Sequence, residues 1–263
     1  MKDGMDEKLR VLGVEIADMT MEEALELVER LLTAEPVRAT CIYYANAHAL
    51  NLACDDANFR GVLRQANYVF GDGTGIRWAS RMLYGHPPKD NVNGTDFTPR
   101  LFERTAGRGF RYYLLGNTPD RIERAAEYAE QEFPGWTLAG YHHGYLNGEE
   151  EHAAVVSEIN DARPHLLLVG MGNPIQEYWI AANRRRLMVP VCMGIGGLFD
   201  YWSGDLTRAP SWVRRLGHEW VHLLLRQPRK FQRYVAGNPK FLARVTASRV
   251  GAPRNAYMSQ TLH

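Results

Sequence analysis

One aspartate stands in a glycine-rich turn where its carboxylate could act as a general base. Asp72 is the second residue of the motif GDGTG at residues 71–75, directly after a short apolar run. Glycines allow a ligand to approach the backbone closely. A carboxylate is ionised at neutral pH and can accept the proton of an attacking hydroxyl group. The alternative is an aspartate that only stabilises its own turn through hydrogen bonds to the backbone.

A second candidate site is the motif GMGNPIQEYW at residues 170–179. We expect a helix to begin here, with Asn173 as its N-cap and Pro174 as its first residue. The free amides of such a helix end could bind a phosphate group. Gln176 and Glu177 are expected to project from the first turn at the mouth of the site. The alternative is a well-capped helix in which Glu177 only complements the helix dipole.

Glycines also follow a later apolar run, in the motif GIGG at residues 194–197. This partial Gly-x-Gly pattern could belong to a dinucleotide site. A dinucleotide fingerprint usually occupies the first strand–helix unit of its domain, whereas no strand is predicted after this motif. An NAD(P)-dependent oxidoreductase that uses the loop from Gly194 to Gly197 is kept as the alternative function.

The sequence predicts neither a metal site nor a bound cofactor. The pair His142 and His143 has no second ligand cluster at metal-binding spacing, so a polar loop is the favoured interpretation. The chain also lacks an Asp-x-Asp pair, with which sugar-nucleotide enzymes commonly hold a metal at a diphosphate. Arginines, lysines and helix amides would then stabilise a diphosphate leaving group. Cys41, Cys54 and Cys192 are widely spaced and are expected to be free thiols.

Short β-rich runs alternate with helical patterns through most of the chain. The sequence TMEE at residues 20–23 forms a capping box at the start of one helix. Further helices are expected from about residues 47 and 120, and over 149–160 and 174–187. Strands are expected at residues 11–16, 38–44, 68–70, 110–115, 136–139, 166–169 and 189–193. This alternation predicts an α/β fold, a Rossmann-like, mainly parallel sheet flanked by helices. Ligands of such folds bind at the carboxyl ends of strands, where the glycine motifs lie.

The pattern changes after residue 204, where strands end and helices punctuated by prolines are predicted. Residues 205–263 carry 11 Lys and Arg against 2 Asp and Glu, although the whole chain has a net charge of only +1. We therefore divide the chain into an α/β catalytic core at residues 8–204 and a basic helical C-terminal appendage at residues 205–263. This segment suits an anionic membrane surface or a diphosphate, and its removal is expected to leave a folded core. The alternative is the solvated face of a packed helix.

Neither a signal peptide nor a membrane span is predicted. The N-terminus has mixed charge without an apolar core, and the longest apolar stretch, residues 187–199, is too short to cross a bilayer. The near-neutral total charge argues against a nucleic-acid partner. We expect a cytosolic protein, or one that sits on a membrane without crossing it. A non-catalytic membrane-associated scaffold is a third alternative, and a homo-oligomer is left open.

Several motifs together resemble the WecG/TagA/CpsF glycosyltransferase family. They are GDGTG (71–75), YLLG (113–116), GYHHGY (140–145), GNPIQE (172–177) and GIGGLFD (194–200), followed by RAP at 208–210, LGHEW at 216–220 and QP at 227–228. The resemblance covers residues 13–241. It implies an inverting, metal-independent transferase, peripheral on the cytoplasmic face of the cell membrane, in cell-surface polysaccharide synthesis. The donor would be a UDP-sugar and the acceptor a polyprenyl-diphosphate-linked saccharide. N-acetylmannosamine, its uronic acid and a hexose are all open as the sugar.

The resemblance also implies roles for individual residues. Asp72 matches the proposed base, which would deprotonate the acceptor hydroxyl. The residues expected to bind substrate are Tyr44, Asn46, Gly73, Thr74, Asn93, Asp96, Gly116, Gly172, Gln176, Gly196, Gly197 and Asp200. Basic residues expected at the diphosphate and the membrane are Arg208, Arg226, Arg229, Lys230 and Arg233. Tyr44 is a departure, since some members have a threonine there, and Leu223 stands where some have an appendage arginine.

Overall fold

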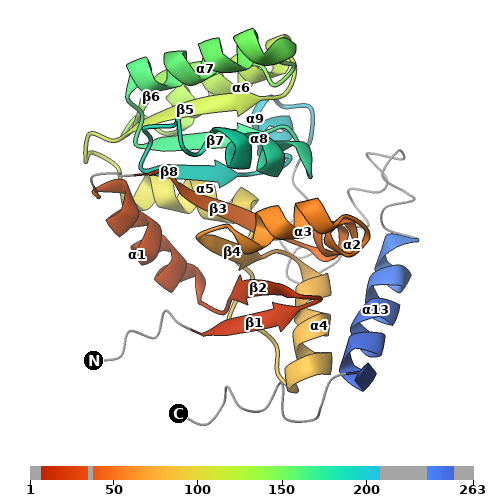
Figure 1. Cartoon of the computed structure of the whole chain (residues 1–263). Coiled ribbons are helices and arrows are strands. Elements are labelled where there is room, and N and C mark those ends of the chain that lie inside the picture. The colour runs from red at the N-terminus through yellow and green to blue at the C-terminus, as the bar shows by residue number, and fades with distance from the viewer. Residues whose placement is uncertain (1–6, 35–37, 208–235, 252–263) are drawn as a thin grey trace.

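An eight-stranded sheet runs through the computed structural model, which describes residues 7–34, 38–207 and 236–251 (Figure 1). The strand order is β1-β2-β4-β3-β8-β7-β5-β6. Only β1 and β2 pair antiparallel, and all other neighbours are parallel. The strands are β1 (Lys8–Val11), β2 (Val14–Ala17), β3 (Thr40–Ala45), β4 (Tyr68–Gly71), β5 (Arg111–Gly116), β6 (Thr137–His142), β7 (Leu166–Gly170) and β8 (Val191–Gly194).

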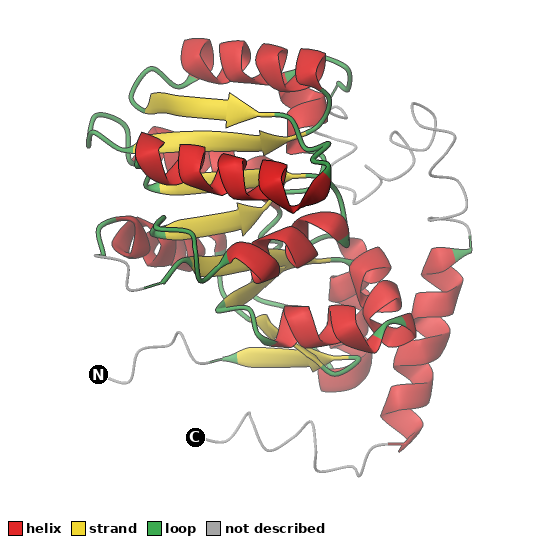
Figure 2. Ribbon diagram, turned by 45° about the horizontal axis from the view of Figure 1, so that its top comes forward, coloured by secondary structure: helices red, strands yellow, loops and turns green. Residues whose placement is uncertain are grey.

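Helices cover both faces of the sheet (Figure 2). One core contains residues of α2, α3, α4, α7, α8 and α13, and the other contains residues of α1, α5, α6 and α9. This arrangement confirms the predicted α/β, Rossmann-like fold. The helices in the described ranges are α1 (Met21–Leu32), α2 (Ala47–Asp55), α3 (Ala57–Arg64), α4 (Thr74–Tyr84), α5 (Gly94–Arg104), α6 (Pro119–Glu132), α7 (Gly148–Ala162), α8 (Ile175–Asn183), α9 (Leu198–Trp202) and α13 (Gly237–Gly251).

The central strands are apolar at every position because both of their faces are buried. In β7, with the sequence LLLVG, all five residues are buried. Leu167 and Val169 belong to one core, whereas Leu166 and Leu168 belong to the other. Parallel strands covered on both faces require such runs, which is why they could be recognised in the sequence.

The strand predicted at residues 11–16 is confirmed in its second half, because Val14–Ile16 belong to β2, but a hairpin turn separates them from Val11 at the end of β1. Leu12 and Gly13 have φ angles of +50° and +82° and connect β1 to β2. The helices α4 and α5 were not predicted. Both contain residues that disfavour helices, Gly75 in the first turn of α4 and Pro99 inside α5, and these obscure the helical pattern.

The predicted capping box at the start of α1 is confirmed. The Thr20 hydroxyl accepts a hydrogen bond of 3.1 Å from the Glu23 amide, and the Glu23 carboxylate accepts one of 2.7 Å from the Thr20 amide. These two bonds satisfy backbone donors that the helix itself cannot pair.

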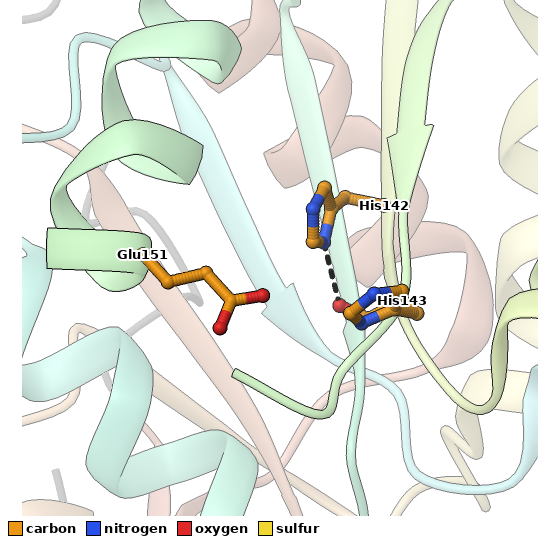
Figure 3. A group of neighbouring side chains, drawn as sticks. All are labelled: His142, His143 and Glu151. Carbon is orange, nitrogen blue, oxygen red and sulfur yellow. Dashed lines mark hydrogen bonds between the residues drawn. The ribbon is translucent and has the colours of Figure 1, made fainter. Parts of the chain in front are cut away.

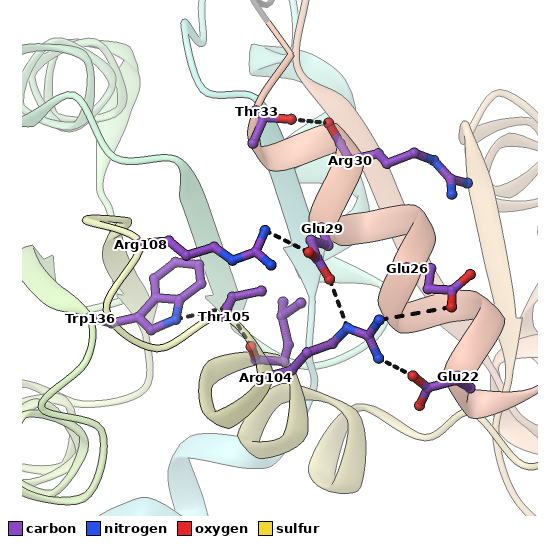
Figure 4. A network of polar contacts seen from close by, with 10 residues as sticks. Glu22, Glu26, Glu29, Arg30, Thr33, Arg104, Thr105, Arg108 and Trp136 are labelled. Atoms are coloured by element: carbon purple, nitrogen blue, oxygen red, sulfur yellow. Dashed lines mark hydrogen bonds and ion pairs between the residues drawn. The ribbon is translucent and has the colours of Figure 1, made fainter.

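Arginines join α5 to α1 (Figure 4). Arg104, in the last turn of α5, forms ion pairs with Glu22 and Glu29 of α1, at 2.7 Å in the case of Glu29. Arg108 pairs with the other oxygen of Glu29 at 2.6 Å. Hydrogen bonds from Arg104 lower the pKa of the Glu29 carboxyl. The network helps to hold α5, whose first residues reach the candidate site.

The part of the appendage that the structure describes packs against the core. Helix α13 lies beside α2 and α4 (Figure 1), and its Phe241 and Val245 are buried in one of the two cores. Lys240 forms an ion pair of 2.9 Å with Asp55 of α2. Arg244 also pairs with Asp55 and donates a 2.9 Å hydrogen bond to the Asn51 carbonyl.

Some sequence predictions concern residues outside the described part of the chain. They are the basic residues Arg208, Arg226, Arg229, Lys230 and Arg233. Among the described helices, none is both long and apolar enough to span a bilayer. Cys41 and Cys192 are buried free thiols, as expected, and Cys54 is a partly buried one.

Candidate active site

A cavity of about 490 Å³ opens at the carboxyl ends of β3, β4, β5, β7 and β8. The chain leaves β3 toward β4 on one side, yet the other neighbour of β3 is β8, the last strand. Such a reversal creates a crevice at the strand ends, where α/β sheets bind ligands. The lining residues are Tyr44, Asn46, Asp72, Gly94, Thr95, Asn117, Gly144, Tyr145, Gly170, Met171, Gly172, Asn173, Ile175, Gln176, Gly194, Ile195, Gly196, Gly197, Asp200, Tyr201 and Leu206.

Asp72 and Tyr44 lie on neighbouring strand ends in the wall of this cavity. The Asp72 amide donates a 2.9 Å hydrogen bond to the Ala45 carbonyl, which ties the turn after β4 to the end of β3. Burial, with a smaller contribution from the negative charge of Asp72, raises the pKa of Tyr44 well above its usual range. The Tyr44 hydroxyl has no hydrogen-bond partner in the described part of the chain. It is therefore a neutral, buried donor beside the cavity.

Asn46 lines the cavity at the start of α2. It is the N-cap of α2, and its side-chain oxygen accepts hydrogen bonds of 3.1 Å from the amides of His48 and Ala49. The cap thus occupies the oxygen and leaves the Nδ2 group for a ligand.

Gln176 connects the two glycine loops that follow β7 and β8. Its side-chain oxygen accepts hydrogen bonds from the Gly172 amide at 3.1 Å and from the Gly196 amide at 3.0 Å. Its Nε2 group donates a 2.8 Å hydrogen bond to the carboxylate of Glu177. Gln176 therefore fixes the shape of the cavity wall as well as lining it.

Glu177 is buried beneath the cavity and does not project at its mouth as predicted. Its Oε1 atom accepts hydrogen bonds from Gln176 and from Asn173. Burial raises the pKa of Glu177 to about 7, against the opposing effect of those two hydrogen bonds. The predicted cap of α8 is also wrong, because Pro174 is the N-cap and the Asn173 side chain is used to hold Glu177.

Asp72 follows β4, on one side of the point where the strand order reverses, and Asp200 follows β8, on the other side. Asp200 belongs to a group of polar side chains there. Its carboxylate accepts a 2.9 Å hydrogen bond from the Asn117 side chain, and Arg121 lies 3.8 Å from the same oxygen. Asn117 follows Gly116, whose φ of +147° and close contact with Gly170 leave no room for a side chain. Asp200 is thus anchored by two residues of the loop after β5 and the helix that follows it.

Comparison with known proteins identifies the family of the chain. The family described as "Glycosyl transferase WecG/TagA/CpsF family" matches residues 9–255. The chain belongs to this family. It is 32% identical over 219 residues, 83% of the chain and 84% of the relative, to the N-acetylglucosaminyldiphosphoundecaprenol N-acetyl-beta-D-mannosaminyltransferase of Staphylococcus aureus strain NCTC 8325. It is 31% identical over the same share to the protein of that name from strain MRSA252. The protein is a glycosyltransferase, so the oxidoreductase alternative is not retained.

Eight of the predicted site residues of this glycosyltransferase line the cavity together. These residues lie at or after the ends of β3, β4, β7 and β8, which are far apart in sequence. They are Tyr44, Asn46, Asp72, Gly172, Gln176, Gly196, Gly197 and Asp200.

The other five predicted residues within the described part do not line the cavity. Asn93 caps α5 and bonds both the amide and the carboxylate of Asp96. Gly73 precedes α4 with a φ of +87°, and its amide donates to the Asn91 side chain. The remaining two are Thr74 and Gly116.

Several lining residues of the glycosyltransferase were missed as site residues. Gly94 and Thr95 begin α5, which was not predicted, and a side chain at Gly94 would press on the Tyr44 ring, 3.2 Å away. Gly144 and Tyr145 lie in the GYHHGY motif, which carried the family resemblance but was interpreted as a polar loop. Among the described residues, one group of His, Cys, Asp and Glu side chains lies close enough to share a metal ion, and it is outside the cavity lining.

Proposed function

We propose that this glycosyltransferase moves a sugar from a UDP-sugar to a hydroxyl group of a polyprenyl-diphosphate-linked saccharide, with inversion at the anomeric carbon. The observation that carries the proposal is the position of Asp72, a carboxylate at the end of β4 in the cavity wall. The acceptor oxygen attacks the anomeric carbon as its proton passes to Asp72, and the bond to UDP breaks on the opposite face. UDP leaves with the bonding electrons.

The relatives favour a particular donor and acceptor. Their name describes transfer of N-acetylmannosamine to N-acetylglucosaminyl-diphospho-undecaprenol. We propose a donor of the N-acetylmannosamine type, with its uronic acid and a hexose as the alternatives. The acceptor class is a lipid diphosphate that carries a saccharide.

We propose that no divalent metal is needed at the donor diphosphate. Asp200, the second carboxylate of the cavity, already interacts with Asn117 and Arg121. The excess of cations in residues 205–263, 11 against 2 acidic residues, supplies groups that can neutralise the diphosphate and an anionic lipid surface. We propose peripheral attachment at the cytoplasmic face of the membrane, through Arg226, Arg229, Lys230 and Arg233 among these.

A panel of UDP-sugars with a lipid-diphosphate acceptor tests the reaction. Mass analysis should show an N-acetylhexosamine added to the acceptor, and the anomeric coupling in the product should show inversion relative to the donor. Transfer should proceed without any added divalent cation. Transfer from none of the UDP-sugars, or a product with the donor's own anomeric configuration, would contradict the proposal.

The role of Asp72 is tested by Asp72→Asn, which keeps the size of the side chain and removes its basicity. We expect kcat to fall about 10²- to 10⁴-fold, the usual contribution of a general base. UDP should still raise the thermal stability of this variant, since binding to the folded state is retained. Asp120→Asn, at an exposed position in α6, is the matched control and should keep full activity.

Membrane attachment is tested by replacing Arg226, Arg229, Lys230 and Arg233 together with glutamine. These changes leave α13 and its contacts with the core in place. Binding to vesicles that contain anionic lipid should weaken, and each lost charge near the surface is worth about 1 kcal/mol. The same protein should bind neutral vesicles no less well than before. Unchanged binding to the anionic vesicles would rule out this surface.

A further inference from the structure

Three side chains with metal-binding groups meet where β6 ends and α7 begins (Figure 3). His142 is the last residue of β6, His143 follows it, and Glu151 lies in the first turns of α7. Their potential ligand atoms all lie within 4.8 Å of one another. Figure 3 shows the Glu151 carboxylate directed toward the two imidazole rings. The strand ends between the two histidines, so the usual alternation of side chains across a sheet does not separate them.

The hydrogen bond of His142 determines which of its nitrogens can bind a metal. Its Nδ1 atom lies 2.8 Å from the His143 carbonyl oxygen. A carbonyl can only accept, so Nδ1 carries the proton and Nε2 carries the lone pair. Metal-binding histidines commonly donate their second nitrogen to a backbone carbonyl in this way, which fixes the ring and its tautomer.

His143 has a buried nitrogen that lacks a partner. Its Nδ1 atom is shielded from solvent and makes no hydrogen bond within the described part of the chain. Its ring lies 4.4 Å from the His142 ring, at an angle of 53°. A buried ring nitrogen normally has a bonding partner. A metal ion bound by the two histidines would be that partner.

Glu151 is held in place by one oxygen and offers the other. Its Oε2 atom accepts a 2.6 Å hydrogen bond from the Asn147 amide. No described lysine or arginine forms an ion pair with it, so its charge is not neutralised by the described part of the chain.

We propose that His142, His143 and Glu151 bind a divalent transition-metal ion of the Zn²⁺ class, with a fourth position filled by water. Two imidazoles and a carboxylate suit such an ion, with ligand distances of about 2.0–2.2 Å. Binding requires the three side chains to move closer together than they lie in this structure, where their ligand atoms are within 4.8 Å of one another. The ion ties the end of β6 to α7 and so holds the intervening loop, whose Gly144 and Tyr145 line the cavity. The three ligands are not lining residues, so sugar transfer itself does not pass through the ion.

The sequence offered a poor signal for this site because Glu151 is separated from His143 by a loop. The histidine pair alone was interpreted as polar, with no metal expected. Helix α7 places Glu151 beside the end of β6, and this contact depends on how the helix packs rather than on the local sequence.

Direct metal titration of the untagged, chelator-treated full chain tests the proposal. Zn²⁺ alone, followed by calorimetry, should bind at one site, and Co²⁺ in its place should give the visible absorption of a four-coordinate ion. Affinity should fall at least tenfold in His143→Ala and in Glu151→Gln. The second variant keeps the size of the side chain and its position in α7, which protects the test from a folding defect.

Matched controls separate this site from other metal-binding groups. His86→Ala removes an exposed histidine, and Glu150→Gln removes the neighbouring acid of the same helix. Both should bind Zn²⁺ like the unaltered protein. The proposal is overturned if the unaltered protein binds no Zn²⁺ at micromolar concentration, or if His143→Ala and Glu151→Gln bind it as tightly as the controls do. Because the readout is metal affinity, it is independent of the proposed transfer reaction.

Discussion

Gln176 donates a 2.8 Å hydrogen bond to the carboxylate of Glu177, and both side chains are buried. This contact orients the Gln176 amide so that its oxygen faces the two backbone amides it accepts from, those of Gly172 and Gly196. The loops after β7 and β8 are therefore joined through one side chain whose orientation is set by a carboxylate outside the cavity.

Gln176→Ala should damage both the fold and the site. It leaves the amides of Gly172 and Gly196 without their acceptor, at a cost of about 1–3 kcal/mol for each donor that water cannot reach. The loss of stability should appear as a lower midpoint in urea unfolding. The value of kcat/KM should fall as well, because both loops belong to the cavity wall. Gln131→Ala, at an exposed position in α6, should change neither quantity.

Glu177 should make stability fall as the pH rises toward neutrality. Burial raises its pKa from 4.5 to about 7. Between these values the unfolded chain has lost the proton that the folded protein still holds, so folding becomes less favourable as the pH increases. The stabilisation that comes from the raised pKa of Glu177 is complete below pH 4.5 and is lost as the pH rises through 7. The shift in pKa corresponds to about 3 kcal/mol in the free energy of unfolding.

Glu177→Gln removes this titration and should flatten the stability curve between pH 4.5 and 7. The measurement is the free energy of unfolding by urea at several pH values. Glu127→Gln, exposed on α6, should leave the slope as it is. A slope that is the same in Glu177→Gln and the unaltered protein would show that Glu177 is not the group responsible.

The middle of the sheet could be predicted from sequence because β4, β5, β7 and β8 are mainly apolar runs that end in glycine. The run in β7, LLLVG, is the clearest case. The glycine loops then located Asp72, Gly172 and Gly196 at strand ends, and these three residues do meet in one cavity.

The details of the site depend on contacts between distant segments, which local patterns do not contain. Gln176 turns inward because Gly194, on the neighbouring strand, has no side chain; a Cβ atom there would lie 3.0 Å from the Gln176 amide. Glu177 at the start of a helix matches an exposed, dipole-compensating carboxylate in sequence, and only the packing of α8 on the sheet buries it. The alignment of Glu151 with the histidine pair has the same origin.

Gly116→Ala should disrupt the end of β5. A Cβ atom at Gly116 would lie 2.3 Å from the Gly170 carbonyl oxygen, and the φ of +147° is one that other residues rarely adopt. The contact is with backbone, so the paired ends of β5 and β7 must separate. We expect a destabilisation of at least about 2 kcal/mol and weaker binding of UDP.

The matched control for Gly116→Ala is Gly61→Ala in α3. A Cβ atom there meets nothing within 4 Å. Alanine should stabilise the helix interior by about 0.5–1 kcal/mol relative to glycine. If both variants unfolded at the same urea concentration, the close approach of Gly116 to Gly170 could not be important for stability.

Phe241→Ala should loosen the docking of α13 on the core. The Phe241 side chain is 1% exposed and packs in the core shared with α2 and α4, so its truncation should cost about 3–5 kcal/mol. Val250→Ala, at an 83% exposed position of the same helix, should cost almost nothing. Urea unfolding measures both. The burial of Phe241 and Val245 also bears on removal of the whole appendage, which would uncover apolar surface on α2 and α4 and lower the stability of the remaining core. Equal stability of Phe241→Ala and Val250→Ala would show that α13 does not contribute to the core in solution.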